Sequence, residues 1–470
     1  MKDSMNKLKK FGKTSFIYLL GTVFSKAVMF LLLPIYTRYL TPSTYGLYDL
    51  SITYNTLVFS ILYLDIFGVI MRFMYDFEGK EREKPIINGF IIFTASTILY
   101  AFIILTLNLF QVEGFNNPIY LILVGISTNL QQTVGFIARA FHKNKIFVVG
   151  GMVGTIITFC ATFLFLVILN KNYEYIYIST TIGMLVSSMY IWNKTNLFSK
   201  LKLTNIDFSL LKEMQKYALP LSVNSAAVWF LTGFNRFIIS NQLSLSANGF
   251  YAVATKFSGV VNLVTTGFQM AFQEIVFEDS HQDRKRLGVF YTRSLNTYIS
   301  FLVCGISLAL PFLNIVFPFI IDPNFSNAKV LIPLALLSAV FASLSSFLAS
   351  MLSALKKTNY IFTTTVQAAI VNVIVVVIFI NYLGVQAANI SLVLGFGVIV
   401  FARLRLVNKF VNVRLDYKNL FINLMIFLIS SFVFIEFGIW ANIVNIIVII
   451  FLATIFNKKL LLMFYEKIKE

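Results

Sequence analysis

Charged side chains lie inside stretches of this sequence that are otherwise apolar: Lys26, Asp49, Arg236, Lys256 and Arg293. A charge at the depth of a lipid bilayer costs about 2.5–3.5 kcal/mol on insertion scales, so these residues must face protein or water. Ammonium and guanidinium groups bind phosphate oxygens, and here the cations outnumber the single carboxylate. The set therefore predicts a hydrated cavity that binds an anion, with a phosphate or pyrophosphate as its natural ligand.

Polar side chains accompany these charges at the spacing of one helix face. In the span 217–240, Ser225, Trp229 and Arg236 follow one stripe, and in the span 46–74 Asp49 and Thr53 lie one turn apart. We therefore predict that further polar and aromatic residues line the cavity: Thr22, Thr53, Ser225, Trp229, Asn129 and Gln132. Trp229 has two open roles, stacking on a sugar ring or filling space between helices. Arg293 is expected to bring a polar stripe of its own, Asn296, Thr297 and Ser300.

Each charge also has an alternative explanation. Lys26 and Lys256 could form a structural ion pair with Asp49 instead of lining the cavity. Arg236 and Arg293 are close enough to span ends to reach the membrane surface with their long side chains. For Asp49 three roles stay open: a site for a coupling proton or cation, a partner for Lys256, or a solvated acid near a helix start.

Other kinds of chemistry find little support in the sequence. The two histidines, His142 and His281, fall in basic loops, and the two cysteines, Cys160 and Cys304, fall in apolar stretches. We predict no catalytic residue, no metal site and no bound cofactor. The segment Gly12–Thr14 reads like the end of a phosphate-binding loop, but position 7, where that loop needs glycine, is lysine. ATP hydrolysis is therefore not expected.

The chain that must position these residues is built for a membrane. It is 58% hydrophobic and only 12% charged over 470 residues, which excludes an ordinary soluble protein. Each apolar stretch is long enough for a helix to cross a bilayer. We predict an all-α integral membrane protein with about fourteen transmembrane helices, at 15–36, 46–74, 85–109, 118–140, 146–169, 174–193, 217–240, 248–277, 287–317, 328–354, 359–381, 386–406, 419–438 and 440–456.

The distribution of Lys and Arg predicts the orientation. One set of alternating loops holds 30 of the 38 basic residues, and the opposite set holds only Arg38, Lys171 and Lys329. Basic loops stay in the cytoplasm, so we expect both termini there. Most of the net charge of +18 then lies on cytoplasmic loops near anionic lipid, and nucleic-acid binding is not expected.

An internal repeat organises the spans. The segment "YLTPSTYGLYDL" (39–50) matches "QLSLSANGFYAV" (242–253) at Leu, Ser, Gly and Tyr, with a shift of 203 residues. Six spans separate the copies, an even number, so both copies insert in the same direction, as in parallel-repeat transporters. We predict a six-helix lobe at 1–205, a second at 206–408, and two further helices and a cytoplasmic tail at 409–470, with Lys194–Lys216 as linker.

Three segments resemble a known family: "LLLPIYTRYLTPSTYGLYDL" (31–50), "YALPLSVNSAAVWFLTGFNRFIISNQLSLSANGFYAVATKF" (217–257) and "NFSNAKVLIPLALLSAVFASLSSFLASMLSALKKTNY" (324–360). They look like bacterial polysaccharide flippases for O-antigen or capsule repeat units, in the multidrug/oligosaccharidyl-lipid/polysaccharide exporter superfamily. The similarity runs from the N-terminus to about residue 410, and the last two helices are generic. The resemblance implies a V-shaped exporter of two lobes that works by alternating access in the bacterial cytoplasmic membrane.

The same resemblance implies a cargo and partners. The cargo would be an undecaprenyl-pyrophosphate-linked oligosaccharide, moved from the cytoplasmic to the outer leaflet with H⁺ or Na⁺ as coupling ion. Relatives meet the pyrophosphate with cavity cations, and Lys26, Arg236 and Lys256 occupy comparable positions. A polysaccharide polymerase and a chain-length regulator would be partners. Many relatives have aspartate where this chain has Asn235, which puts a coupling role at that position in doubt.

Two other functions remain as alternatives. A membrane polysaccharide polymerase would need ionisable groups on a long external loop, whereas the external loops predicted here are short. A multidrug exporter of the same fold would carry lipophilic cations, which prefer an acidic cavity to a basic one. Both alternatives are therefore weaker than an anion transporter.

Overall fold

The computed structural model describes residues 21–201, 203–278 and 284–456, and all regular secondary structure in these residues is helical. Residues 21–30 are helical, ahead of α2. The longer helices that follow are α2 (Leu33–Tyr39), α3 (Pro42–Leu62), α4 (Ile66–Met74), α5 (Lys84–Leu109), α6 (Pro118–Ala140), α7 (Asn144–Thr162), α8 (Glu174–Thr195), α9 (Phe208–Thr232), α10 (Phe234–Gln242), α11 (Leu245–Glu278), α12 (Arg284–Ile320), α13 (Ala328–Ala354), α14 (Asn359–Leu383), α15 (Gln386–Asn408), α16 (Tyr417–Glu436) and α17 (Ile439–Phe456).

The prediction of an all-α membrane protein is confirmed. In the described residues, every predicted span coincides with one helix or with two consecutive ones, and α6 and α13 have the predicted bounds, 118–140 and 328–354. Residues 15–20 of the first predicted span lie outside the described residues. Within the described residues, eight helices are long and apolar enough to cross a bilayer, and the bent pair α3–α4 would make a ninth. The polar helices α9, α10 and α11 are not among them.

The chain divides into two compact units. One comprises residues up to Ser240 together with 244–249, and the other comprises 241–243 together with the chain from Phe250 onward. These units are defined by packing, whereas the predicted lobes are defined by the repeat, so the lobe boundary at 205/206 stays a prediction. By packing, α9 and α10 belong with the helices of the first unit.

Helix α9 begins earlier than the sequence predicted. Its first residue is Phe208, and the carboxylate of Asp207 caps it by accepting from the Ser209 and Leu210 amides at 2.9 and 3.2 Å. The basic linker predicted at Lys194–Lys216 is therefore wrong in its second half, because Lys212 and Lys216 lie in the helix.

The span predicted at 46–74 is broken in the structure. Helix α3 ends at Leu62, α4 starts at Ile66, and the two axes meet at 40°. Leu64 and Asp65 between them have left-handed φ values of 54° and 51°, which side chains other than glycine rarely adopt. Beyond the break, α4 packs on α6, where the ring of Phe67 lies 4.9 Å from that of Phe136.

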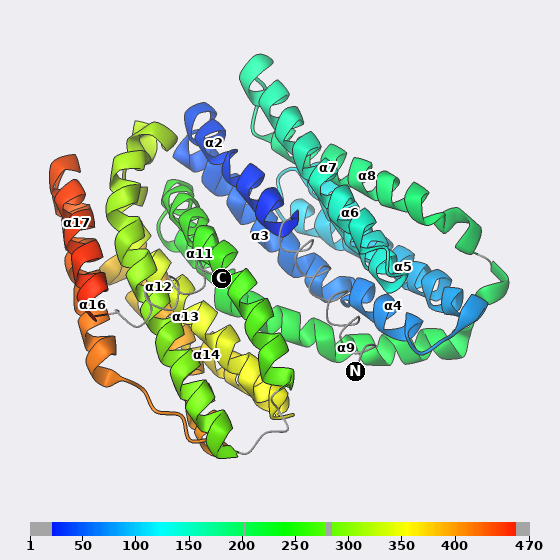
Figure 1. The fold of residues 1–470 in the computed structure, drawn as a ribbon. Coiled ribbons are helices and arrows are strands. Elements are labelled where there is room, and N and C mark those ends of the chain that lie inside the picture. The colour runs from blue at the N-terminus through cyan, green and yellow to red at the C-terminus, as the bar shows by residue number, and fades with distance from the viewer. Residues whose placement is uncertain (1–20, 202, 279–283, 457–470) are drawn as a thin grey trace. The chain divides into compact units, whose positions relative to one another are not determined.

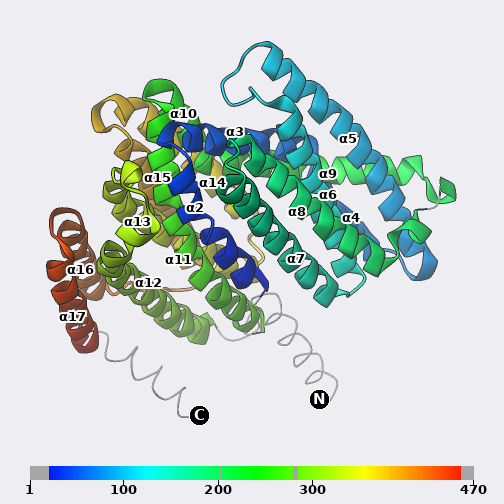
Figure 2. The same ribbon diagram turned by 90° about the horizontal axis from the view of Figure 1, so that it is seen from above.

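A stripe of polar side chains attaches α16 and α17 to α12 in the second unit, and Figures 1 and 2 both show these helices beside one another. Asn423 of α16 donates to Ser300 Oγ at 3.2 Å, and Ser430 donates to the Ser307 carbonyl at 2.7 Å. Asn445 of α17 continues the series by donating to Ser430 Oγ at 3.3 Å. Apolar helices in lipid associate through such contacts because lipid removes the hydrophobic drive between them.

Candidate functional site

The two repeated corners begin their helices in the same way. Thr41 forms a capping box at the start of α3, since its hydroxyl accepts from the Thr44 amide at 3.2 Å and its own amide donates to Thr44 Oγ1 at 3.0 Å. Ser244, 203 residues later, accepts from the Ala247 amide at 3.1 Å just before α11. The 203-residue shift thus matches one hydroxyl cap to the other, so the sequence repeat corresponds to a repeated helix start.

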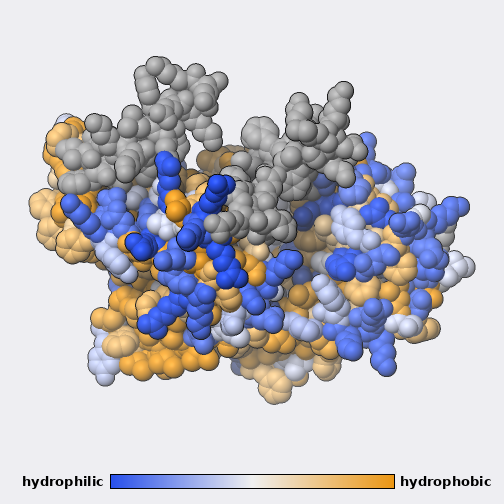
Figure 3. Space-filling view, turned by 60° about the horizontal axis from the view of Figure 1, so that its bottom comes forward, coloured by the Kyte–Doolittle hydropathy of each residue, from blue (hydrophilic) through white to orange (hydrophobic). Residues whose placement is uncertain are grey.

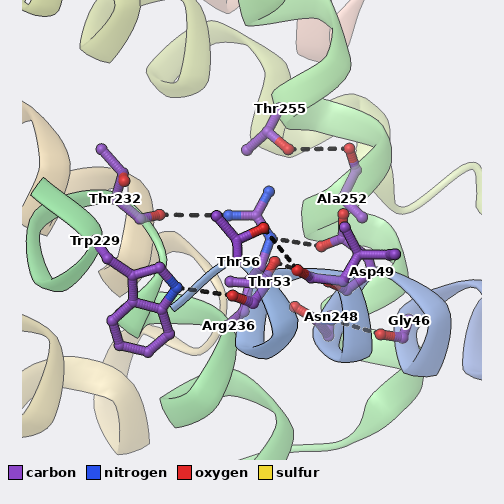
Figure 4. Close-up of polar contacts among 11 residues, drawn as sticks. Gly46, Asp49, Thr53, Thr56, Trp229, Thr232, Arg236, Asn248, Ala252 and Thr255 are labelled. Carbon is purple, nitrogen blue, oxygen red and sulfur yellow. Dashed lines mark hydrogen bonds and ion pairs between the residues drawn. The ribbon is translucent and has the colours of Figure 1, made fainter. Parts of the chain in front are cut away.

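The corners also pack on each other at their matched glycines. A methyl group on Gly46 would lie 1.9 Å from the Leu245 carbonyl oxygen, and one on Gly249 would lie 2.1 Å from that of Pro42. Leu245 is the repeat equivalent of Pro42, so the two contacts are reciprocal. Asn248 fixes the crossing by donating to the Gly46 carbonyl at 2.7 Å, as Figure 4 shows. The symmetry inferred from sequence is therefore visible in the first compact unit itself.

Asp49, one turn beyond Gly46, forms an ion pair with Arg236 of α10. Arg236 Nε donates to Asp49 Oδ2 at 2.5 Å (Figure 4), and Arg236 Nη1 also contacts the Thr232 carbonyl at 3.3 Å. Asp49 is only 9% exposed. An ion pair so shielded from water is held more strongly than one on a surface, because solvent screens it less.

This pairing bears on the three roles considered for Asp49. A solvated acid is wrong because the carboxylate is buried, and it forms an ion pair with Arg236. The structure brings together two of the predicted cavity residues, from the stripes of the second and seventh spans. Asp49 stays a candidate coupling site, now with a named cation beside it.

Trp229, on α9, joins that helix to α3 one turn beyond Asp49. Its indole N–H donates to the Thr53 carbonyl at 2.8 Å, and the side chain is 8% exposed. Gly233 makes room for the ring, because a methyl group there would lie 2.6 Å from Trp229 Nε1. The structure therefore gives Trp229 a packing role, with its polar edge satisfied by protein.

The other predicted cavity residues lie in different surroundings. Lys26 is exposed on the first described helix, where Thr22 is half-buried, and Lys256 is exposed on α11. Ser225 is half-buried in α9, and the hydroxyl of Thr53 donates to the Asp49 carbonyl at 2.7 Å. Lys26 and Lys256 belong to different compact units, so a cavity shared by both stays a prediction.

Asn129 and Gln132 both lie on α6. Asn129 is 1% exposed and donates to the Gly125 carbonyl at 2.9 Å within its own helix, while Gln132 is half-buried. Asn129 is packed inside the first unit, so in this structure it is placed to stabilise helix packing. Its contribution to a cavity stays a prediction.

Arg293 lies on α12, and its neighbours on that helix face α16. Asn296 donates to the Arg414 carbonyl at 2.8 Å, and Ser300 accepts from Asn423. Arg293 itself is exposed and lines a hollow beside Arg414, in the connection from α15 to α16. The polar stripe on α12 is thus used to attach α16, and Arg293 lies at its end.

Sequence reasoning missed Arg403. It falls near the end of the predicted span 386–406 and was not among the candidate residues, but it lies in α15 with only 4% of its surface exposed. Its guanidinium donates to the Ser345 carbonyl at 2.7 Å, to Thr364 Oγ1 at 3.0 Å, and to the Ile361 carbonyl and Thr365 Oγ1, each at 3.1 Å. The signal that could have found it is the run of three threonines at 363–365, unusual inside an apolar span.

The part of the chain that the structure describes holds no group of three or more His, Cys, Asp or Glu side chains that could bind a metal. The first compact unit offers recognition through charge, with the shielded acid–base pair Asp49–Arg236 and the exposed cation of Lys26. Such an arrangement can bind and release an anion, and can respond to anything that neutralises Asp49.

Comparison with known proteins places this geometry in context. The model of one protein family, described as polysaccharide biosynthesis protein, matches residues 11–273, more than half of the chain. A comparison with curated protein sequences gave no match. The matched region includes both repeated corners and the Asp49–Arg236 pair.

Solved structures share the fold over most of the chain. The lipid II flippase MurJ, in an inward closed conformation, matches with a TM-score of 0.74 at 17% identity, covering 96% of this chain and 99% of that one. An inward-facing multidrug resistance MATE family transporter of the MOP superfamily matches with a TM-score of 0.64 at 15% identity, covering 86% and 95%. A MATE transporter from Vibrio cholerae, VcmN, matches with a TM-score of 0.55 at 12% identity, covering 85% and 97%. At these identities the likeness shows the fold alone.

Proposed function

Because the chain belongs to the polysaccharide biosynthesis protein family, we propose that it flips undecaprenyl-pyrophosphate-linked oligosaccharide from the cytoplasmic to the outer leaflet of the bacterial cytoplasmic membrane. Both termini would be cytoplasmic, as the basic loops predict. The fold it shares with the lipid II flippase MurJ over nearly its whole length supports the proposal. The product would be a surface polysaccharide such as O-antigen or capsule, with a polymerase and a chain-length regulator as downstream partners.

The observation that carries the proposal is the exposure of Lys26 and Lys256. Both lysines lie in helices that are otherwise apolar or uncharged over several turns, and both side chains are exposed. A lysine presented to lipid would be costly, so each is expected to face water or a charged ligand. A pyrophosphate carries the opposite charge and suits an ammonium group.

The experiment uses purified full-length protein in proteoliposomes with a fluorescent undecaprenyl-pyrophosphate-linked oligosaccharide. Its transfer between leaflets is followed by quenching from one side. We expect the double variant Lys26→Gln/Lys256→Gln to slow transfer by about a hundredfold or more, because charge-assisted contacts are worth about 1.5–3 kcal/mol each.

The matched control is Lys80→Gln/Lys145→Gln, which removes the same charge from exposed loop and helix-start positions of the first unit. It should transfer the lipid at the wild-type rate. Equal rates in the two double variants would refute the pyrophosphate site. Transfer of a lipophilic cation in place of the anionic lipid would instead favour the multidrug function of the MATE transporters that share the fold.

Coupling to H⁺ or Na⁺ is part of the proposal. The ion pair Asp49–Arg236 suggests how coupling would work, since Arg236 is occupied as long as Asp49 is charged. A proton on Asp49, or a sodium ion beside it, would release the guanidinium for the pyrophosphate. The affinity for the cargo would then depend on whether the coupling ion is bound, as an exchange of ion for cargo requires.

A further inference from the structure

A basic hollow lies between the start of α12 and the connection from α15 to α16. Its volume is about 600 Å³, and the residues that line it include Arg284, Lys285, Arg293 and Arg414. Among the described residues, which resume at Arg284, no acidic side chain lines it. All four basic side chains belong to exposed residues, so they are accessible to a ligand.

The walls of the hollow are held in place by hydrogen bonds. The Arg414 amide donates to Thr292 Oγ1 at 3.1 Å, and the Asp416 amide donates to Asn296 Oδ1 at 2.9 Å. Gly288 allows the connection to lie against α12, because a methyl group there would be 2.9 Å from the Asn412 carbonyl oxygen. The backbone that carries Arg293 and Arg414 is thus held in place, which lowers the entropic cost of binding.

The surroundings indicate that the ligand is a lipid. The hollow lies where two candidate membrane spans begin, α12 at Arg284 and α16 at Tyr417. Directly after Arg414, α16 carries a continuous stripe of exposed apolar side chains at helical spacing: Tyr417, Phe421, Met425, Leu428 and Phe432. Figure 3 brings the lower end of Figure 1 forward and shows hydrophilic residues gathered on that face, with hydrophobic residues at its edge.

We propose that this hollow binds the phosphate of an anionic glycerophospholipid, whose acyl chains lie along the apolar stripe of α16. A headgroup phosphate satisfies clustered guanidinium and ammonium groups, and basic pockets between helices on the cytoplasmic side of a membrane are suited to it. The site holds a resident lipid that fixes α16 against α12. It is therefore independent of which cargo the protein moves.

The test is native mass spectrometry of the purified full-length protein titrated with phosphatidylglycerol. In the variant Arg293→Gln/Arg414→Gln, we expect the dissociation constant for phosphatidylglycerol to rise about thirtyfold, since each basic residue near an anionic lipid contributes about 1 kcal/mol. A second variant, Arg284→Gln/Lys285→Gln, changes the exposed start of α12 and should weaken lipid binding by a similar factor. It keeps the test valid if the Arg293→Gln/Arg414→Gln variant fails to fold. Phosphatidylcholine with the same acyl chains should bind weakly to all variants.

The matched control is Lys212→Gln/Lys216→Gln, which removes two exposed lysines from α9, in the other compact unit. It should retain phosphatidylglycerol as the wild type does, and an equal loss in this control would overturn the site. Inorganic phosphate should compete only at far higher concentration, and competition at equal concentration would mean a free-phosphate site instead. Displacement of phosphatidylglycerol by undecaprenyl pyrophosphate at equal concentration would assign the hollow to the cargo and also overturn the proposal.

Discussion

At the scale of single residues, charge is handled here by pairing and by hydrogen bonding to uncharged groups. Asp49 and Arg236 neutralise each other, whereas Arg403 is buried among two hydroxyls and two carbonyl oxygens. Both solutions remove the cost of a charge away from water. The two arrangements differ in whether they can be switched. The Asp49–Arg236 pair opens when the acid is neutralised, whereas the hydrogen-bond acceptors of Arg403 are hydroxyl and carbonyl oxygens that do not titrate.

Arg403 is predicted to hold α13, α14 and α15 together. Replacing it with glutamine removes most of its donors and leaves acceptors unpaired, so we expect the protein to lose about 2 kcal/mol or more of stability. The measurement is thermal unfolding in detergent. Arg405→Gln is the control, because Arg405 is exposed on the same helix and packs over the Phe401 ring. Identical unfolding temperatures for the two variants would contradict the structural role.

The sequence predicted which residues at the site carry charge, but not how they pair. Helical spacing put Asp49 and Arg236 on polar stripes, yet the repeat shift pointed to Lys256 as the partner because it lies one turn from the equivalent of Asp49. The actual partner depends on the depth and crossing angle of α3 and α10, which periodicity does not contain. Arg403 was missed for a related reason, since a cation near a span end is equally consistent with a loop.

At the scale of helices, the lengths of the apolar stretches and the polar residues between them predicted most helix boundaries closely. α6 starts with proline in its first turn, and its predicted bounds agree with the structure. The break between α3 and α4 was not predictable, because aspartate tolerates left-handed φ but leucine, at position 64, rarely adopts it. Tertiary packing on both sides of the break must hold this conformation, and a single sequence does not reveal such packing.

The glycines at the repeated corners give a prediction at this scale. Gly46→Ala should push α3 away from the start of α11, because the added methyl group would meet backbone, and overpacking typically costs about 1–3 kcal/mol. Gly249→Ala should do the same through Pro42. Unfolding temperature in detergent measures the effect. Gly259→Ala on α11 is the control: a methyl group there meets nothing within 4 Å, so this variant should be as stable as the wild type.

At the scale of the whole molecule, the two copies of the predicted repeat share their helix caps and glycines but differ in their charged residues. The caps Thr41 and Ser244 and the glycines 46 and 249 obey the 203-residue shift, whereas the charges do not: Asp49 is matched by Ala252, and Lys26 by Trp229. Backbone geometry is thus preserved where the two copies cross, and side-chain chemistry differs beside it. Family and fold followed from the sequence, while the cargo and its coupling ion depend on contacts that no repeat encodes.

Coupling can be tested on the intact transporter through Asp49. In proteoliposomes with an imposed proton or sodium gradient, the wild type should transfer the lipid-linked oligosaccharide faster than without the gradient. Asp49→Asn removes the charge that holds Arg236, so we expect transfer down the cargo's own gradient to continue while stimulation by the ion gradient falls at least about tenfold.

Asp76→Asn is the control, since Asp76 also pairs with an arginine, Arg72, but at an exposed helix end. It should keep the wild-type response. A gradient response in Asp49→Asn equal to that of the control would place the coupling acid elsewhere in the chain, and loss of transfer even without a gradient would mean that the pair only supports the packing of α3 against α10.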